Sequence, residues 1–344
     1  MAEATAREVA TDPRWLPHTY DISGSMLTSV FVPRERRSDL MFLSDEHFKD
    51  DFRKATFPAR DVAAHAAEAP DGPLHFIFHT ALCGSTLMVK ALDQPGHAHG
   101  LKEPDVLINL ANRLTRSDDA GNRERLKLVL RLLARPFAAG EAVVVKPSNI
   151  ANRLALPALE ARADSRAVLL YSDVRTLLRS ILNRGMWGRI WGRRIFQSMA
   201  AWTSLRLGYS AEEVFLLTDL QALALGWLMQ VNHFGEVARR MGDRVMIVDS
   251  AKFLADPAPT LRSVANLFGL GMDAAAIEAI VNGPTFARHS KLSDRSYGQA
   301  ERAADQGAAE SAHREELEMV VKWIESVAAH LGVDLDPARA GLGR

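Results

Sequence analysis

Residues 74–88 read LHFIFHTALCGSTLM, in which an apolar strand leads into a short Gly/Ser/Thr turn that opens an apolar-faced helix. A helix N-terminus presents unpaired backbone N–H groups and the positive end of the helix dipole, and a glycine lets an anion approach the backbone closely. Ser85 and Thr86 add two hydroxyl donors. The pattern predicts a phosphate-binding loop, and the alternative is a turn that only caps a core helix.

The same turn lacks the signature of a nucleoside-triphosphate loop. That signature is G-x-x-x-x-G-K-[ST], whose lysine reaches the outer phosphates and whose hydroxyl holds magnesium. Gly84 is followed directly by Ser85, so a metal-assisted NTPase is disfavoured and no metal is expected. A phosphate ligand that needs no Walker lysine is favoured.

Composition and charge exclude several classes of function. The chain of 344 residues is 47% hydrophobic and 24% charged, enough to bury a large core. Its 42 basic and 42 acidic residues cancel, which gives no case for nucleic-acid binding or an anionic membrane surface. The longest apolar run, 214–231, is interrupted by polar residues and suits a buried helix better than a membrane span. The single cysteine, Cys83, and the lack of a signal-peptide pattern at the start predict a cytoplasmic protein.

From residue 74 onward, short apolar runs alternate with longer stretches of helical period. This alternation predicts an α/β fold of P-loop-like, three-layer type, a mostly parallel central sheet with helices on both faces. Candidate strands cover 74–78, 142–145, 167–171 and 245–248, with a weaker one before Lys102, and apolar helical stripes cover 126–133, 174–181 and 261–268. We expect a wrapping segment over 1–70, the core over 71–292, a mobile loop over 293–312 and a C-terminal helix and tail over 313–344.

Two segments place a charged residue at the end of an extended piece, directly before a proline. They are GLKEP, ending at Pro104, and VVVKP, ending at Pro147. Proline biases the preceding residue toward extended geometry, so Glu103 and Lys146 are expected to project from the carboxyl edge of the sheet, where open α/β sheets bind ligands. The functional interpretation makes Glu103 a general base and Lys146 a cation that stabilises developing negative charge. The alternative makes both, with Lys102, members of ordinary ion pairs.

The segment after Tyr171 carries further candidates for phosphate binding. Ser180 and Arg184 are four residues apart and thus on one helix face, where a hydroxyl and a guanidinium can grip a phosphate; a solvated face explains them equally well. The run 184–194 alternates aromatic and basic residues and could stack on a base, form a lid, or bury its tryptophans as an amphipathic element. A basic cluster ending at Lys291 suits a segment that closes over a phosphate, or an ordinary surface.

Taken in order, the motifs over about residues 74–291 resemble the sulfotransferases that use 3′-phosphoadenosine 5′-phosphosulfate (PAPS), a family with a P-loop-like α/β fold and no metal requirement. The family's 5′-phosphosulfate loop, approximately K/R-S-G-T-T-hydrophobic, is similar to LCGSTL at 82–87. Its 3′-phosphate helix, R-x-P-R-x-x-x-x-S, resembles SDVRTLLRS at 172–180 in part. Its late Y-E-D-L-x-x-D-P segment and the helix end F-L-G-L resemble SAKFLADP at 250–257 and LFGL at 267–270.

The tyrosylprotein branch of that family has the most similar spacing. Its catalytic glutamate follows the loop glycine at about the interval from Gly84 to Glu103, an arginine follows its phosphate-binding serine by one turn, and its catalytic lysine lies on a later strand. The resemblance implies that Glu103 and Lys146 are catalytic. It also implies that PAPS is bound by Ala81, Leu82, Cys83, Gly84, Ser85, Thr86, Ser180, Arg184 and Lys291.

Three positions depart from the family pattern. Leu82 stands at the basic position of the loop, Ser172 at the first arginine of the 3′-phosphate motif, and Ser148 at the histidine base of the cytosolic branch. The resemblance implies transfer of a sulfuryl group from PAPS to a hydroxyl or amine of a small-molecule or protein acceptor that the sequence does not identify. The alternatives are a non-catalytic or repurposed nucleotide-binding relative, which Leu82 favours, and a P-loop kinase, against which the missing Walker lysine argues.

Overall fold

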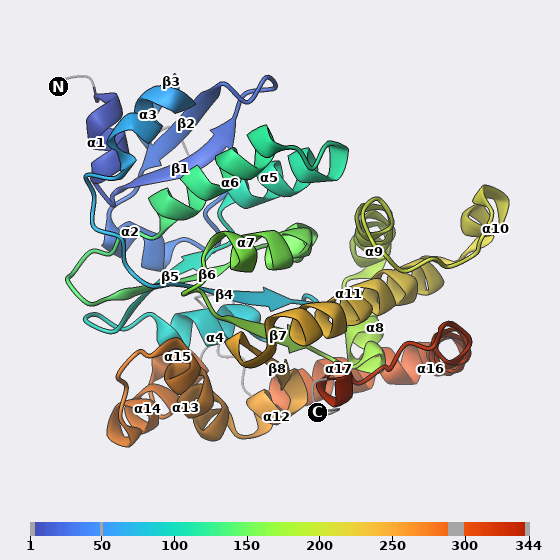
Figure 1. Ribbon diagram of the computed structural model, residues 1–344. Coiled ribbons are helices and arrows are strands. Elements are labelled where there is room, and N and C mark those ends of the chain that lie inside the picture. The colour runs from blue at the N-terminus through green and yellow to red at the C-terminus, as the bar shows by residue number, and fades with distance from the viewer. Residues whose placement is uncertain (1–3, 49–50, 288–298, 341–344) are drawn as a thin grey trace. The chain divides into compact units, whose positions relative to one another are not determined.

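The computed structural model describes residues 4–48, 51–287 and 299–340 (Figure 1). The chain divides into two compact units. The first unit comprises Met1–Phe78, Thr86–Ala167 and Leu261–Ile280, and the second comprises His79–Ser85, Val168–Thr260 and Val281–Arg344. The predicted core over 71–292 is therefore shared by both units, and the segment before residue 71 belongs to the first.

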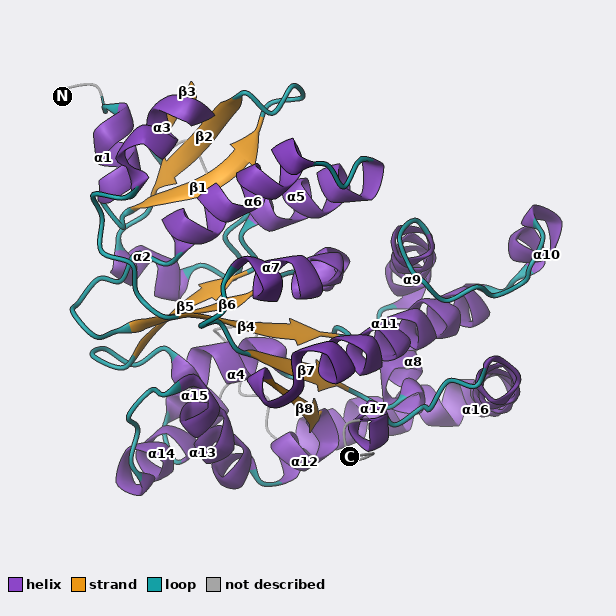
Figure 2. Ribbon diagram, in the orientation of Figure 1, coloured by secondary structure: helices purple, strands orange, loops and turns teal. Residues whose placement is uncertain are grey.

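A five-stranded parallel sheet with strand order β5-β6-β4-β7-β8, flanked by helices, confirms the predicted α/β fold (Figure 2). Its strands are β4 (Leu74–His79), β5 (Ala98–Lys102), β6 (Ala142–Lys146), β7 (Ala167–Tyr171) and β8 (Val245–Asp249). Every residue of β4, β5, β6 and β7 is buried, as expected for parallel strands covered on both faces. The weaker strand expected before Lys102 is β5.

The register of β5 and β6 places two lysines side by side. The strands pair in parallel from Ala98 opposite Ala142 to Lys102 opposite Lys146. On its other side β6 pairs in parallel with β4, with Phe76 opposite Val145. Since parallel strands end at a common edge of a sheet, the residues that follow Lys102 and Lys146 leave the sheet at the same edge.

The residues before β4 form a sheet of their own, where the sequence predicted only a wrapping segment. Strand β1 (Trp15–Tyr20) pairs antiparallel with β2 (Met26–Phe31), which pairs antiparallel with β3 (Lys54–Pro58). Pro17 made β1 hard to recognise in the sequence, because proline has no backbone N–H to donate to a neighbouring strand. In the structure the register shifts between Pro17 and Thr19.

The helices confirm the predicted apolar stripes. The buried residues of α6 include Leu126, Val129, Leu130 and Leu133, and the stripes at 174–181 and 261–268 are likewise buried. The α-helices before β7 are α1 (Ala6–Thr11), α2 (Arg34–Asp39), α3 (Ala59–Ala66), α4 (Ser85–Leu92), α5 (Asp105–Arg116), α6 (Ala120–Leu133) and α7 (Ala155–Ala161), with the short 3₁₀ turn Asn149–Leu154.

The α-helices after β7 are α8 (Val174–Leu182), α9 (Gly185–Ala200), α10 (Ala211–Leu216), α11 (Asp219–Met241), α12 (Ser250–Ala255), α13 (Pro257–Phe268), α14 (Ala274–Val281), α15 (Pro284–Ala287), α16 (Gln299–Leu331) and α17 (Pro337–Ala340), with the 3₁₀ turn Gly242–Arg244. The long apolar run is split between two of them. Thr218 begins α11 with a capping box to Gln221. The start of the run lies in α10, at the end of an extended connection in Figure 1, where Phe215 is 81% exposed.

Two further expectations differ from the structure. The predicted loop over 293–312 is helical from Gln299, as the start of α16, in which His313 has non-helical φ/ψ angles; residues 293–298 lie outside the described residues. Alanine is the best helix former, which explains helix in this Ala-rich stretch. In α9, Trp187 and Trp191 stack with ring centroids 6.3 Å apart, but Trp187 is 62% exposed, so the tryptophans are not both buried.

None of the helices that the structure describes is both long enough and apolar enough to cross a bilayer.

Candidate functional site

The ends of β5 and β6 bring the two predicted catalytic side chains into contact. The Lys146 ammonium donates a hydrogen bond to Glu103 Oε1 within an ion pair, and the Glu103 backbone N–H donates to the Lys146 carbonyl at 2.7 Å. The Lys146 side chain is fully buried, whereas Glu103 keeps 19% of its side-chain surface exposed. A buried ammonium is therefore joined to a carboxylate that still reaches solvent.

Glu103 has an unusual backbone conformation. Its φ of 53° lies in the left-handed region, which residues with a side chain rarely adopt. The sequence predicted extended geometry here because Pro104 follows, and that prediction is wrong for Glu103. Such strain costs about 1–3 kcal/mol and persists only where the surroundings hold it, most often at functional sites.

A segment of the N-terminal region, residues 38–47, provides part of that support. The Leu43 N–H donates to the Lys102 carbonyl at 2.8 Å, and the Asp105 N–H donates to the Leu43 carbonyl at 3.2 Å. The backbone of Leu43 is thus hydrogen-bonded to one residue before Glu103 in the chain and to one residue after it. The Phe42 ring centroid lies 5.3 Å from Lys146 Nζ, a cation–π distance. Nothing in the sequence signalled this role for residues 1–70.

Lys102 is a second buried cation next to the pair. Its ammonium donates to the Ser38 carbonyl at 2.7 Å, and only 2% of the residue is exposed. Burial, followed by repulsion from the Lys90 ammonium, lowers the pKa of Lys102 to about 8. Lys102 and Lys146 lie opposite each other on neighbouring strands.

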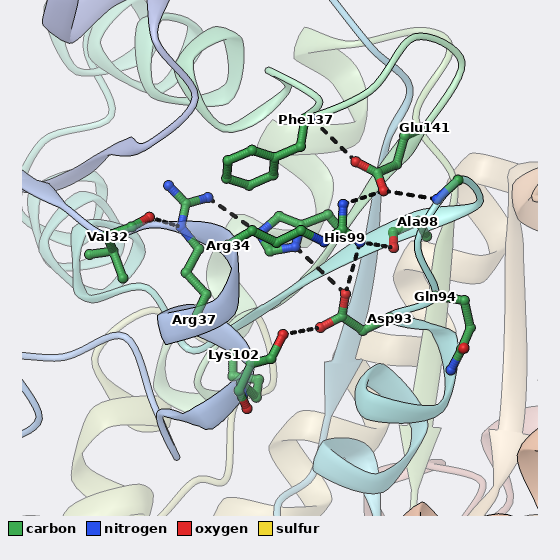
Figure 3. A network of polar contacts seen from close by, with 12 residues as sticks. Val32, Arg34, Arg37, Asp93, Gln94, Ala98, His99, Lys102, Phe137 and Glu141 are labelled. Atoms are coloured by element: carbon green, nitrogen blue, oxygen red, sulfur yellow. Dashed lines mark hydrogen bonds and ion pairs between the residues drawn. The ribbon is translucent and has the colours of Figure 1, made fainter.

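A partly buried polar network fixes α2, the helix that carries Ser38 (Figure 3). The Arg34 guanidinium donates to the fully buried carboxylate of Glu141 and to Asp93 Oδ1 at 3.5 Å, and the Ser38 hydroxyl donates to Asp93 Oδ2 at 3.1 Å. Buried networks whose charges are partnered are rigid. The network thus holds α2 so that the Ser38 carbonyl meets Lys102.

The predicted phosphate loop, residues 81–86, has a distinctive backbone. Ala81 and Leu82 adopt φ values of 73° and 53°, and Gly84 adopts 83°. Left-handed residues in a turn aim successive backbone N–H groups toward one concave side, which suits an anion. Helix α4 begins at Ser85, and its first N–H groups have no partner within the helix.

Strand β7 and the residues after it anchor this loop within the second unit. The Thr80 N–H donates to the Leu170 carbonyl at 3.1 Å, and the Ser172 N–H donates to the Thr80 hydroxyl at 3.2 Å. A Cβ atom added at Gly84 would lie 3.1 Å from Leu254 Cδ2, so this glycine is needed for space as well as for its φ. Cys83 is 1% exposed, which fits a small buried filler.

Two hydroxyl groups of the loop region are buried. Ser85 is 4% exposed and Thr86 is 1% exposed. The Thr86 hydroxyl makes no hydrogen bond to any described residue, and a buried polar group without a partner calls for an explanation. A bound phosphate oxygen would supply the missing partner. Leu82, half-buried, brings no charge to the loop.

The structure places Ser180 and Arg184 near each other, but not on one helix. Helix α8 ends at Leu182, so Arg184 lies beyond it, and its guanidinium donates to the Ser180 backbone carbonyl. Arg175, the arginine of the partial 3′-phosphate motif, forms a bidentate ion pair with Glu318 at 2.7 and 2.8 Å. Lys291 lies outside the described residues.

One group of side chains in the described ranges could hold a metal ion. It consists of His18, Asp45 and Asp105, whose ligand atoms lie within 4.8 Å of one another. Lys54 Nζ already lies 3.0 Å from Asp45 Oδ1 and neutralises part of the acidic charge. The predicted site residues fall in both units: Glu103, Lys146 and Thr86 in the first, and 81–85, Ser180 and Arg184 in the second.

No protein-family model and no curated protein matches the chain. Among solved structures, a sulfotransferase domain from the curacin biosynthetic pathway is similar at 9% identity and a TM-score of 0.41, over 77% of this chain and 99% of that one. A sulfotransferase from Alicyclobacillus acidocaldarius is similar at 14% identity and a TM-score of 0.38, over 78% and 98%.

A sulfotransferase domain from the Synechococcus PCC 7002 olefin synthase is similar at 12% identity and a TM-score of 0.36, over 70% of this chain and 94% of that one. All three bear the family name that the sequence motifs suggested. At these identities and TM-scores the likeness carries no argument about activity, and the chemistry of this chain rests on its own residues.

Proposed function

We propose that this protein transfers a sulfuryl group from PAPS to a hydroxyl or amine acceptor. The observation that carries the proposal is the contact between Glu103 and Lys146 at the ends of two adjacent parallel strands. A carboxylate with access to solvent can act as a general base, and a buried ammonium beside it can stabilise negative charge as it forms. The left-handed conformation of Glu103 supports a functional role for this pair rather than an ordinary ion pair.

The proposed reaction is an in-line displacement at sulfur. The Glu103 carboxylate takes the proton of the acceptor hydroxyl, whose oxygen attacks the sulfur atom. The bond from sulfur to the 5′-phosphate oxygen breaks, and 3′-phosphoadenosine 5′-phosphate leaves with the electron pair. Lys146 stabilises the charge on this leaving oxygen. The ion pair between Glu103 and Lys146 in the unliganded protein must therefore open. Glu103 then contacts the acceptor hydroxyl, and Lys146 contacts the leaving oxygen.

The donor would be held by the loop and by the residues that follow β7. The backbone N–H groups of 81–86, with the Ser85 and Thr86 hydroxyls, would bind the 5′-phosphate. Ser180, Arg184 and Lys291 would bind the 3′-phosphate and so select PAPS over ATP, since arginine offers forked donors to phosphate.

A specific observation favours a second candidate, a relative that binds the nucleotide without catalysis. Leu82 supplies no cation at the loop position that is basic in the family, so Lys146, with Lys102, would have to stabilise the leaving group without it. The tyrosylprotein branch, the cytoplasmic location and a small-molecule or protein acceptor stay predictions of the sequence.

Titration calorimetry separates the candidates. The full chain is titrated with 3′-phosphoadenosine 5′-phosphate and, separately, with ATP and magnesium. Binding of the first ligand with preference over the second is expected, and a preference for ATP with magnesium would overturn the proposal. A transfer assay with labelled donor and a panel of hydroxyl and amine acceptors then distinguishes an enzyme from a nucleotide-binding relative.

A further inference from the structure

The first unit contains a pocket of about 880 Å³ that none of the residues assigned to sulfuryl transfer lines. It lies between the β1–β2 turn, α3 and α6, and its apolar lining includes Met26, Pro58, Ala63 and Leu128. Most of the surface within the pocket is apolar. Small-molecule sites typically enclose about 300–1,000 Å³ and combine an apolar lining with a few polar groups, so the size suits a small molecule.

Among the described residues, Arg125 is the cation of this pocket that forms no direct ion pair, although the Asp119 carboxylate is near enough to interact with it electrostatically. The residue is half-buried, and its guanidinium donates to the Gly24 carbonyl at 2.7 Å and to Asn122 Oδ1 at 3.2 Å, both neutral oxygens. A guanidinium withdrawn from water without a carboxylate is costly. Its charge is therefore only partly compensated within the described residues, which leaves it able to pair with an anionic ligand.

The other cations that line the pocket each have an acidic partner. Lys127 Nζ lies 2.7 Å from Glu124, the Arg131 guanidinium lies 3.6 Å from Asp71, and the Arg60 guanidinium lies 3.4 Å from Asp61. These three pairs neutralise their own charges. The contrast with Arg125 identifies one position for one negative charge.

Tyr20 adds an unused donor to the same pocket. The residue is 3% exposed, and its hydroxyl makes no hydrogen bond to any residue in the described part of the chain. Burial raises the pKa of Tyr20 to about 12, although the Arg125 and Arg113 guanidinium groups lie close enough to oppose the shift. The hydroxyl thus stays protonated at neutral pH and can donate to an oxygen of a ligand.

We propose that this pocket binds an amphiphilic anion, a small molecule with an apolar chain or ring and one carboxylate or sulfate head group. The head group pairs with Arg125, because guanidinium donors match the geometry of planar and tetrahedral oxyanions. The apolar body lies against Met26, Pro58 and Leu128, where burial of its methylene groups favours binding. An uncharged or cationic molecule of the same shape loses the contact with Arg125.

The test begins with calorimetric titration of the full chain by three ten-carbon probes below their micelle concentrations: decanoate, decyl sulfate and decyltrimethylammonium. Both anions are expected to bind at one site, and the cation at least tenfold more weakly. The ratio of the two anion affinities distinguishes a carboxylate from a sulfate preference. Equal binding of the cation, or binding of neither anion, would overturn the proposal.

A matched pair of substitutions locates the site. Ala63 and Ala64 are neighbouring exposed residues of α3, and only Ala63 lines the pocket. Ala63→Trp fills the pocket and is expected to weaken anion binding at least tenfold, whereas Ala64→Trp leaves it unchanged. If Ala63→Trp binds the anions as the wild type does, the pocket is not their site.

A second pair tests the head group. Arg125→Gln is expected to remove the difference between anionic and cationic probes, whereas Arg123→Gln, which alters an exposed α6 arginine paired with Asp118, keeps it. A preference for anions that survives Arg125→Gln counts against the assignment. Titration with 3′-phosphoadenosine 5′-phosphate is expected to give the same affinity for Ala63→Trp and wild type. Failure of the nucleotide to bind either protein would overturn the proposed sulfuryl transfer but would leave the proposed anion pocket unaffected.

Discussion

Lys102 and Lys146 lie opposite each other on adjacent parallel strands, and their buried ammonium groups have different partners. Lys146 forms an ion pair with the Glu103 carboxylate, whereas Lys102 donates to the neutral Ser38 carbonyl at 2.7 Å. One buried charge is thus compensated by direct contact with an acid and the other is not. The difference explains why burial lowers the pKa of Lys102 to about 8.

The charge of Lys102 should give transfer a pH dependence. The folded protein protonates Lys102 only below about pH 8, so we expect the transfer rate at saturating donor to fall as pH rises through 8. Lys102→Arg should move this fall to higher pH, because arginine stays charged. Rate profiles of both proteins from pH 6 to about 10 make the comparison. Superimposable profiles would show that the charge at position 102 does not assist transfer.

The lowered pKa of Lys102 predicts that protein stability, unlike the transfer rate, rises with pH. The unfolded chain keeps the Lys102 proton up to its usual pKa of 10.5, whereas the folded protein loses it near pH 8. Because the unfolded state then binds more protons, the contribution of Lys102 to the free energy of unfolding rises between pH 8 and 10.5. The difference in the free energy of unfolding by urea between wild type and Lys102→Met, measured across this pH range, gives the contribution of Lys102. A difference between the two that stays constant with pH would contradict the expectation.

Glu103→Gln should abolish transfer and spare donor binding. The amide keeps the size of the side chain and an oxygen that accepts from Lys146, but it cannot take a proton. Loss of a general base lowers the rate about 10²–10⁴-fold, while the affinity for 3′-phosphoadenosine 5′-phosphate stays unchanged. Glu46→Gln, at an exposed position of the 38–47 segment, is the control. Equal activity of Glu103→Gln and wild type would refute the base assignment.

Glu103 and Lys146 should be coupled in stability. Glu103→Gln leaves the fully buried Lys146 ammonium without a carboxylate, whereas Glu103→Gln combined with Lys146→Met removes both charges. Removing one member of a buried pair is more costly than removing both. A double-mutant cycle by urea unfolding is expected to give a coupling energy of about 0.5–3 kcal/mol. Additive effects would mean that the contact contributes nothing in solution.

Gly84→Ala should impair donor binding beyond its effect on stability. Gly84 and Gly96 share a φ of 83°, but a Cβ at Gly84 would press on Leu254, whereas one at Gly96 meets open space. Alanine in a left-handed conformation costs about 1–2 kcal/mol at either position. Only Gly84→Ala is expected to weaken binding of 3′-phosphoadenosine 5′-phosphate in calorimetry. Equal nucleotide affinity of both variants would remove the loop from the donor site.

Arg184→Ala should weaken donor binding about tenfold or more, because a charge-assisted hydrogen bond contributes about 1.5–3 kcal/mol. Arg193→Ala is the control, since that arginine of the same region already pairs with Asp219 at 2.5 Å. Calorimetric titration with 3′-phosphoadenosine 5′-phosphate measures both. Equal losses in the two variants would point to a general effect of positive charge rather than to a 3′-phosphate contact.

The sequence predicted what depends on local pattern. Buried parallel strands are continuous apolar runs, so β4, β6, β7 and β8 were found, and the Gly/Ser turn after β4 was placed correctly at the start of α4. The contact between Glu103 and Lys146 could be anticipated, because strand ends meet at one sheet edge.

What the sequence could not predict depends on contacts between distant residues. Two hydrogen bonds of Leu43 flank Glu103, some sixty residues later in the chain, and no local motif encodes such a pairing. The left-handed backbone of Glu103 overrides the preference that Pro104 imposes. Strand β1 was not recognised in the sequence because Pro17 interrupts its pattern. Helix α8 ends earlier than the spacing of Ser180 and Arg184 suggested.

The two hydrogen bonds of Leu43 have a practical consequence for anyone who seeks a minimal version of this protein. A chain shortened to begin at β4 would retain the glycine turn and could still capture nucleotide, yet it would lose the support that Leu43 gives to the left-handed backbone of Glu103. We expect such a fragment to bind nucleotide but not to catalyse sulfuryl transfer. A measurement of binding affinity alone would therefore not reveal its loss of activity.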